Sequence, residues 1–249
     1  MRRGRRVSAE ICPVPRALLA AAGRRASVGE RVAALSRALL GRPYLAQPLI
    51  GTADTPEILT IRLDGFDCVT YVETVLGLAL ARGPRQLAAC VRQLRYQGGR
   101  VAWTFRHHYM TDWIRENTRG GFLSRVPLPG PAVARTRLLG VVAGLPRRRI
   151  ILRCLPKRAF WRARAAVRSG DILCFASTRR DLDVFHIGFA VWSGGELRLR
   201  SAARSRGCVI GQVRPAPCSA ARPTANASGA GTDHQHSGSS SLPPAPTPR

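Results

Sequence analysis

The sequence predicts an α+β domain, because helical patterns come first along the chain and short strand patterns follow them. Helical patterns cover three segments, at residues 28–41, 68–82 and 84–96. Strand patterns cover three later segments, at residues 171–176, 185–192 and 196–200. Hydrophobic residues make up 45% of the chain, which is enough to bury a sizeable core and excludes disorder of the whole chain.

The first predicted helix has an apolar face. Its apolar residues recur at helical spacing, and they are Val28, Val32, Leu35, Leu39 and Leu40. Gly41 and Pro43 follow, and a glycine with a proline just beyond it is typical of a helix end.

The second predicted helix has clearer end signals. Asp67 is a strong N-cap residue, so we expect this helix to begin at Cys68. Gly83 and Pro84 stop it, because proline cannot continue a helix and glycine readily adopts the closing conformation. A third helix is expected from Pro84 to Tyr96, with three side chains directed inward: Leu87, Val91 and Leu94.

The three strand patterns are short. The last two are joined by Ser193-Gly194-Gly195, which predicts a hairpin. Between the helices and the strands, residues 122–149 contain four prolines and many arginines. We therefore expect that stretch to be mostly loop with short strands.

The composition divides the chain into three parts. Residues 28–212 are expected to form one domain, preceded by a poorly ordered segment at residues 1–27. Residues 213–249 are rich in Pro, Ser and Gly and predict a disordered tail, in which His234 and His236 are interpreted as solvated rather than as metal ligands. The basic start of the chain is not followed by an apolar stretch long enough for a secretory signal, and no run of 18 apolar residues predicts a membrane span.

The charge is strongly unbalanced, with 40 basic residues against 14 acidic ones and a formal net charge of +26. All but one of the basic residues are arginine, and Lys157 is the exception. A phosphate backbone attracts lysine and arginine alike, so this bias points to a GC-rich coding sequence rather than to selection for nucleic-acid binding. No familiar nucleic-acid-binding motif is present, and we expect no specific nucleic-acid partner.

One of the seven cysteines has a setting that favours chemistry. The cysteines are scattered and form no C-x-x-C pair, which argues against a disulfide framework and against a zinc site. Cys68 follows the Asp67 cap, where unpaired backbone N–H groups and the helix dipole favour a thiolate and could bind an oxyanion. The alternative is that Cys68 is a small buried hydrophobic residue, as most free cysteines are.

A nucleophilic cysteine needs a base, and the predicted domain contains three histidines: His107, His108 and His186. His186 lies in an apolar strand, where a histidine is most often structural. A cysteine at a helix N-terminus followed by a histidine on a sheet is nevertheless the papain-like arrangement. The sequence alone leaves both interpretations of His186 open.

Several strings in the chain occur in the order of a known family. They are L-D-G-F-D-C-V-T-Y-V-E-T-V-L-G-L-A-L-A (63–81), R-Y-Q-G-G-R-V-A-W-T-F-R-H-H-Y-M-T-D-W-I-R-E-N (95–117) and S-G-D-I-L-C-F-A…L-D-V-F-H-I-G-F-A-V (169–191), with P-Y-L-A-Q-P-L-I-G (43–51) upstream. Together they resemble the N-acetylmuramyl-L-alanine amidase-like branch of the NlpC-type cysteine peptidase superfamily, over roughly residues 28–212. The resemblance implies a papain-like fold, in which the catalytic cysteine begins a helix packed on a small antiparallel sheet.

The same resemblance assigns roles to individual residues. It makes Cys68 the nucleophile and His186 the general base and then acid. Five further residues would bind substrate: Arg106, His108, Tyr109, Glu73 and Asp67. For Glu73 an alternative remains, because a carboxylate paired with an arginine in the core would fit the helix equally well.

The chain departs from the superfamily at one position. A third polar residue, usually histidine, orients the catalytic imidazole from the strand after the base, and Arg200 falls where we align it. A cation there would disfavour the imidazolium that catalysis needs. Either Ser201 or a backbone carbonyl then orients His186, or this protein is catalytically impaired.

The resemblance implies hydrolysis of the N-acetylmuramyl–L-alanine amide bond of peptidoglycan fragments through a thioester, with no metal or organic cofactor. A stem-peptide endopeptidase with the same cysteine and histidine is the first alternative, and an impaired, basic wall-binding domain is the second. The expected partner is peptidoglycan or a muropeptide, and the protein is expected to be a monomer. The resemblance favours the bacterial cell envelope or periplasm, whereas the lack of a convincing signal peptide leaves the cytoplasm open.

Overall fold

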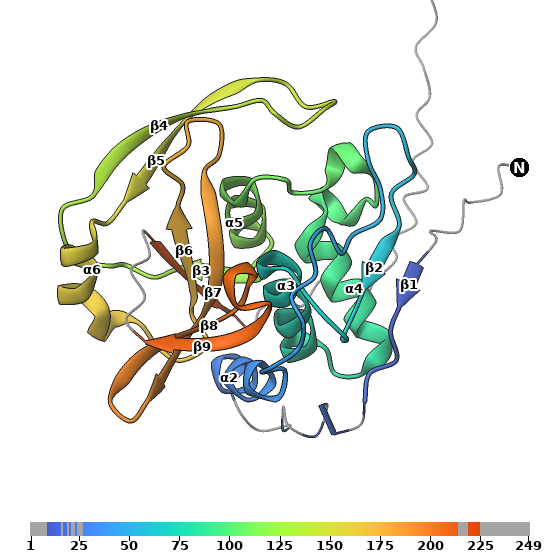
Figure 1. Cartoon of the computed structure of the whole chain (residues 1–249), viewed down its shortest axis with the longest axis horizontal. Coiled ribbons are helices and arrows are strands. Elements are labelled where there is room, and N and C mark those ends of the chain that lie inside the picture. Colours follow the sequence, from blue (N-terminus) through green and yellow to red (C-terminus); the bar gives the residue numbers. More distant parts are fainter. Residues whose placement is uncertain are drawn as a thin grey trace, which may run out of the picture.

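The computed structural model of the chain describes residues 9–15, 17–18, 20, 23, 27–213 and 219–224. Its centre is a six-stranded sheet with the strand order β3-β10-β6-β7-β8-β9, and every neighbouring pair is antiparallel. The strands are β3 (Leu123–Arg125), β6 (Ile172–Ala176), β7 (Val184–Ser193), β8 (Glu196–Ala203), β9 (Cys208–Val213) and β10 (Ser219–Pro223). Helices precede most of these strands in the chain, so the α+β prediction is confirmed (Figure 1).

Four helices share a core with one face of the sheet. They are α2 (Val28–Ala38), α3 (Cys68–Leu80), α4 (Pro84–Arg95) and α5 (Met110–Arg119). Helix α3 lies in the middle of this layer, and all its residues from Thr70 to Ala79 are buried. Ile187 and Phe189 of β7 belong to the same apolar cluster as α3, so this strand lies directly under the helix.

The opposite face of the sheet has its own, smaller core. Phe160 of helix α6 (Lys157–Ala163) is fully buried there against Leu173, Ala190 and Leu199. Strands β4 (Val133–Leu139) and β5 (Arg148–Cys154) pair with each other and form a long arm, which Figure 1 shows arching from α6 over the end of the sheet towards α5. The remaining elements are β1 (Ala9–Ile11), which pairs in parallel with β2 (Leu59–Ile61), and four short 3-10 helices at Gln97–Gly99, Trp103–Phe105, Arg164–Ala166 and Arg204–Arg206.

The three predicted helices form close to their expected bounds. Ser27 caps α2 by a reciprocal pair of bonds with Glu30, and the helix ends at Ala38, before the expected Gly41. Helix α3 begins at Cys68 as predicted. The predicted hairpin is also confirmed, because Gly194 and Gly195 join β7 to β8 with φ values of 59° and 74°, as a tight primed turn requires.

Residues 122–149 are mostly loop with short strands, as expected, and the strands are β3, β4 and the start of β5. Two other expectations need correction. The segment 1–27 contains β1, which the parallel pairing with β2 holds. The tail predicted from residue 213 supplies β10, which lies between β3 and β6, so the sheet extends past the expected boundary at residue 212.

Other expectations fall outside the described residues. They concern the basic start of the chain, Cys218, and the rest of the Pro/Ser/Gly-rich tail with His234 and His236. Among the described helices, none has the length and apolar character needed to cross a membrane.

Candidate active site

The first turn of α3 is fixed by its cap. The Asp67 carboxylate accepts a hydrogen bond from the Thr70 backbone N–H at 2.7 Å and another from the Thr70 hydroxyl at 2.7 Å. The Thr70 hydroxyl oxygen in turn accepts from the Asp67 backbone N–H at 3.1 Å. This reciprocal pair holds the Cys68 side chain, which is half-buried, at the start of the helix.

Three backbone N–H groups face the sulfur of Cys68. Two belong to the helix start, Cys68 itself and Val69, and the third belongs to Ile187 of β7. The Ile187 N–H is part of the peptide bond that links His186 to Ile187. The sulfur therefore lies beside the backbone of His186, although 118 positions separate Cys68 from His186 in the chain.

The thiol itself is not activated at rest. Burial and the neighbouring Asp67 carboxylate raise the pKa of Cys68 to about 11, and the three N–H groups offset only part of that rise. The sequence led us to expect a lowered thiol pKa, and that expectation is wrong. Loss of solvent around the sulfur outweighs the helix terminus.

His186 is held by a residue on the neighbouring strand. Its Nε2 atom lies 2.9 Å from the Ser201 hydroxyl oxygen, and Ser201 is fully buried. Burial lowers the pKa of His186, so the imidazole is neutral at neutral pH. Since Nε2 is engaged with Ser201, any proton exchange by this imidazole would use its Nδ1 atom.

Arg200 does not face His186. Its Nη1 atom donates to the Ala33 carbonyl at 2.6 Å and to the Ser36 hydroxyl at 3.1 Å, so its side chain is attached to α2. Successive residues of a strand point to opposite faces, and Ser201 therefore points the other way. Of the two groups that the sequence suggested for orienting His186, Ser201 is the one that the hydrogen bond supports.

Tyr44 and Arg204 were not singled out from the sequence. Burial raises the pKa of Tyr44, and the neighbouring Cys68 and Asp67 raise it further. Arg204 acts on the same hydroxyl in the opposite direction. Tyr44 belongs to the upstream string at 43–51, which was the available signal; Arg204 had none.

A small cavity of about 120 Å³ is lined by three of the predicted substrate-binding residues, Arg106, His108 and Tyr109. Arg106 pairs with Glu57 at 3.0 Å and also donates to the Gly51 carbonyl at 3.0 Å. Its guanidinium lies 4.6 Å from the centre of the Trp103 ring. Arg106 is therefore fixed in place, and the structure brings these three residues to one cavity.

His108 and Tyr109, the other two residues of this small cavity, also make polar contacts. His108 Nε2 lies 2.8 Å from the Trp103 carbonyl oxygen. The Tyr109 hydroxyl accepts from the backbone N–H of Val141, in the connection between β4 and β5, at 3.3 Å. Neither Cys68 nor His186 lines this cavity.

Helix α5 joins the two groups of residues. Asp183, just before β7, accepts hydrogen bonds at its Oδ2 from the Thr111 backbone N–H at 2.7 Å and from the Thr111 hydroxyl at 2.8 Å. Tyr109 immediately precedes α5, and His186 is the third residue of β7. Helix α5 and the strand that carries His186 are thus bonded to each other next to Tyr109.

Glu73 is a core residue, and its predicted role in substrate binding is wrong. It is 1% exposed, and its carboxylate accepts from Arg95 Nε at 2.6 Å and from Trp113 Nε1 at 3.1 Å. Burial raises the pKa of Glu73, and the Arg95 guanidinium opposes that rise. The alternative interpretation, a carboxylate paired with an arginine in the core, is the one observed.

A larger cavity, of about 690 Å³, lies between the arm and strands β6 and β7. Its lining includes Phe175 and Phe185, whose ring centres are 5.7 Å and 6.3 Å from that of His186. We refer to it as the arm cavity. Among the described residues, no group of three or more His, Cys, Asp or Glu side chains is placed to hold a metal ion.

Residues 34–129 match the family described as AmiA-like, N-acetylmuramoyl-L-alanine amidase-like. The matched segment includes Cys68 and, of the small cavity, Arg106, His108 and Tyr109, but it ends before His186 and Ser201. No curated protein matches the chain.

Solved structures share the fold over most of the chain. A crystal structure of an N-acetylmuramoyl-L-alanine amidase from Bacteroides uniformis is 24% identical, with a TM-score of 0.70, covering 79% of this chain and 99% of that one. A Legionella pneumophila protein of the DUF1460 family is 20% identical, with a TM-score of 0.68, covering 80% of this chain and 90% of that one. At such identities the likeness establishes the fold that the chain shares with them.

Proposed function

We propose that this protein is a cysteine amidase that hydrolyses the bond between N-acetylmuramic acid and L-alanine in peptidoglycan fragments. The observation that carries the proposal is the position of the Cys68 sulfur at a helix N-terminus and beside the backbone of His186, whose imidazole Ser201 holds. The match of residues 34–129 to an amidase-like family supports the choice of bond.

The protonation states define the first step. At neutral pH the thiol and the imidazole are both uncharged, so there is no ready-made thiolate to attack. His186 therefore takes the Cys68 proton while the sulfur attacks the lactyl carbonyl of the muramic acid, which forms the carbon–sulfur bond. The carbonyl oxygen becomes an oxyanion, which N–H groups of the first turn of α3 and the Tyr44 hydroxyl are positioned to bind.

The later steps return each group to its starting state. His186, now protonated, gives its proton to the alanine nitrogen, the carbon–nitrogen bond breaks, and a thioester remains on Cys68. Water then attacks the thioester while His186 again takes a proton. The carbon–sulfur bond breaks, the muramic acid carboxylate leaves, and His186 returns its proton to the sulfur, which restores the thiol. These reaction steps need no metal or organic cofactor.

Two alternatives use the same structure. A stem-peptide endopeptidase would need the same sulfur and imidazole and would differ only in the bond presented to them. An impaired, basic wall-binding domain was suggested by Arg200, and that reason falls away because Arg200 is bonded to α2. We propose the bacterial cell envelope as the site of action, since the substrate lies there.

Product analysis tests the proposal. Purified protein is incubated with a muramoyl peptide, and the products are identified by mass spectrometry. The amidase releases a peptide with an intact N-terminal alanine together with free N-acetylmuramic acid. Cleavage inside the peptide would establish the endopeptidase instead, and absence of any cleavage would favour the wall-binding domain.

A further inference from the structure

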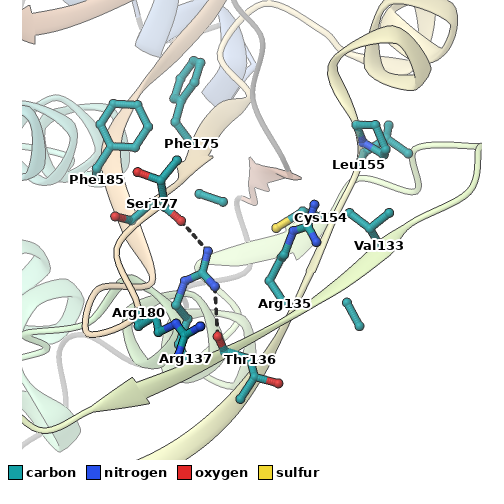
Figure 2. A pocket seen from close by; sticks show the side chains of 14 residues that line it. Val133, Arg135, Thr136, Arg137, Cys154, Leu155, Phe175, Ser177, Arg180 and Phe185 are labelled. Carbon is teal, nitrogen blue, oxygen red and sulfur yellow. Dashed lines mark hydrogen bonds between the residues drawn. The ribbon is translucent and has the colours of Figure 1, made fainter.

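The arm cavity has the size and position of a ligand site. Its volume of about 690 Å³ is within the range of small-molecule pockets, which is roughly 300–1,000 Å³. One wall is the base of the arm and the other comes from β6, the start of β7 and the loop between them (Figure 2). A space of this size holds one or two residues of a peptide and excludes a folded domain or a duplex.

The cavity is strongly positive. Three arginines line it, Arg135, Arg137 and Arg180, and no aspartate or glutamate is among its lining residues. Within the described part of the chain, none of the ion pairs includes any of these three. Positive groups that face a common space without a counter-ion favour an anionic occupant.

Arg137 shows that the site is built into the fold. It is only 7% exposed, and three of its N–H groups donate to backbone carbonyls, those of Leu182 at 3.2 Å, Thr136 at 2.9 Å and Ser177. Figure 2 shows the bonds to Thr136 and Ser177 as dashed lines. A guanidinium has five N–H donors, so two remain for a ligand. Because its partners are neutral carbonyls, the buried guanidinium of Arg137 favours binding of a carboxylate through charge-assisted hydrogen bonds.

The cavity adjoins His186. Phe175 lies opposite His186 in the pairing of β6 with β7, and the Phe185 ring stacks on the imidazole. In the proposed reaction His186 protonates the leaving amine, so the departing peptide lies on the His186 side of the bond. In an N-acetylmuramoyl peptide the muramic acid carboxyl is tied up in the amide, and the free carboxylates are therefore all on the peptide.

We propose that the arm cavity is the subsite for the peptide part of the substrate and that its arginines bind a free carboxylate there. The inference rests on the proposed function for the identity of the substrate, and it makes that function more specific: acidic stem peptides are preferred to amidated ones. The two phenylalanine rings contact the apolar part of the same peptide.

Binding of the released peptide tests the subsite without requiring turnover. Calorimetry compares L-alanyl-D-glutamate with its diamide at about 150 mM salt, where long-range attraction to the basic chain is screened. We expect the acid to bind at least about tenfold more tightly, since charge-assisted hydrogen bonds are lost in the diamide. Equal affinities would overturn the inference.

The arginine variants separate the cavity from general charge. Arg135→Gln and Arg180→Gln, both at exposed positions, should reduce the preference for the acid several-fold each. The control is Arg149→Gln, an exposed arginine of β5 that does not line the cavity, and it should keep the full preference. A loss as large in the control would mean attraction by net charge alone and would overturn the inference.

Turnover then distinguishes the inference from the proposed function. If muramoyl peptides with acidic and amidated stems are hydrolysed equally well, the subsite proposal fails and the amidase proposal stands. If nothing is hydrolysed but the acidic peptide binds in an Arg135- and Arg180-dependent way, the subsite stands and the amidase proposal fails.

Discussion

Cys68 and His186 are both uncharged at neutral pH, and burial is the main cause for each. It raises the pKa of the Cys68 thiol to about 11 and lowers the pKa of His186 below its ordinary value of 6.5. In the proposed mechanism the proton therefore moves from Cys68 to His186 only as the carbon–sulfur bond forms.

This pairing predicts a specific pH dependence. The rate of Cys68 alkylation by iodoacetamide should rise with an apparent pKa near 11, whereas the acid limb of kcat/KM should lie below pH 6.5, where His186 becomes protonated. A Cys68 thiol that titrates below pH 8.5 would contradict the neutral pair and would indicate a thiolate–imidazolium pair instead.

The same shift affects stability. Just below pH 6.5 the unfolded chain binds a proton at His186 and the folded chain does not, so the unfolded state binds more protons. The contribution of His186 to stability is therefore present above pH 6.5 and is lost as the pH falls through the folded pKa. Thermal unfolding between pH 7 and pH 5, compared with that of His186→Gln, measures it.

Ser201 and Arg200 are adjacent in the chain but differ in role. We expect Ser201→Ala to lower kcat about fivefold with little change in KM, since the net value of one hydrogen bond is about 1 kcal/mol. It should also shift the acid limb of the pH profile, because the bond to His186 Nε2 is lost. Arg200→Met is the matched control, and it should lower stability through its lost bonds to α2 while leaving kcat and the acid limb in place. If the acid limb shifts in Arg200→Met and not in Ser201→Ala, then Arg200 rather than Ser201 positions His186, which would contradict the account.

At the scale of elements, the predictable parts were those with local signals. Asp67 caps α3 with its own side chain, and Gly194-Gly195 supply the positive φ values of the hairpin within the turn itself. Such signals lie within a few residues of the structure that they specify, so a sequence pattern detects them.

The elements that were missed depend on distant partners. Helix α5 has no capping side chain at its own N-terminus, and its first turn is bonded to Asp183, 72 positions from Thr111. Strand β10 reads as Ser-Ala-Ala-Arg-Pro and resembles the tail around it, and only its pairing with β3 and β6 makes it a strand. The candidate site shows the same limit, because the sequence left open whether Ser201 or a backbone carbonyl contacts His186, and only the packing of β7 against β8 decides it.

Strand β10 gives a direct test at this scale. Truncation after Val213 removes the strand between β3 and β6 and leaves the buried Asp171 without Arg222, which pairs with it at 2.8 Å. We expect the Tm to fall by at least about 5 °C, given that buried ionic and ladder hydrogen bonds are lost. Truncation after Thr224 retains β10 and is the control, with an expected Tm close to that of the full chain. Equal Tm values for the two truncations would contradict the structural role of β10.

At the scale of the molecule, the structure changes the meaning of the net charge of +26. Several arginines serve as internal hydrogen-bond donors to backbone carbonyls, as Arg95 does to Thr60 at 2.6 Å and Arg31 to Ala79 at 2.7 Å. Arg137 and Arg200 do the same at the arm and at α2. These arginines therefore connect elements of the fold. A basic composition by itself does not define a binding surface.

The sheet and the helical layer meet near the start of β7, and the candidate catalytic residues lie at this junction. Cys68 comes from the helical layer, and His186 and Ser201 come from the sheet. The arm cavity adjoins His186 through Phe175 and Phe185, and α5, which follows Tyr109 of the small cavity, is bonded to Asp183 just before β7. The central claim is that Cys68 is the nucleophile of an amidase at this junction.

Hydrolysis of a muramoyl peptide by Cys68→Ala, followed by mass spectrometry, tests that claim most directly. Cys12→Ala, which removes a half-buried thiol elsewhere, is the control and should retain wild-type activity. The account predicts that Cys68→Ala folds normally and loses at least about 10³-fold in kcat, as expected when a covalent nucleophile is removed. Hydrolysis by Cys68→Ala at the wild-type rate would contradict it.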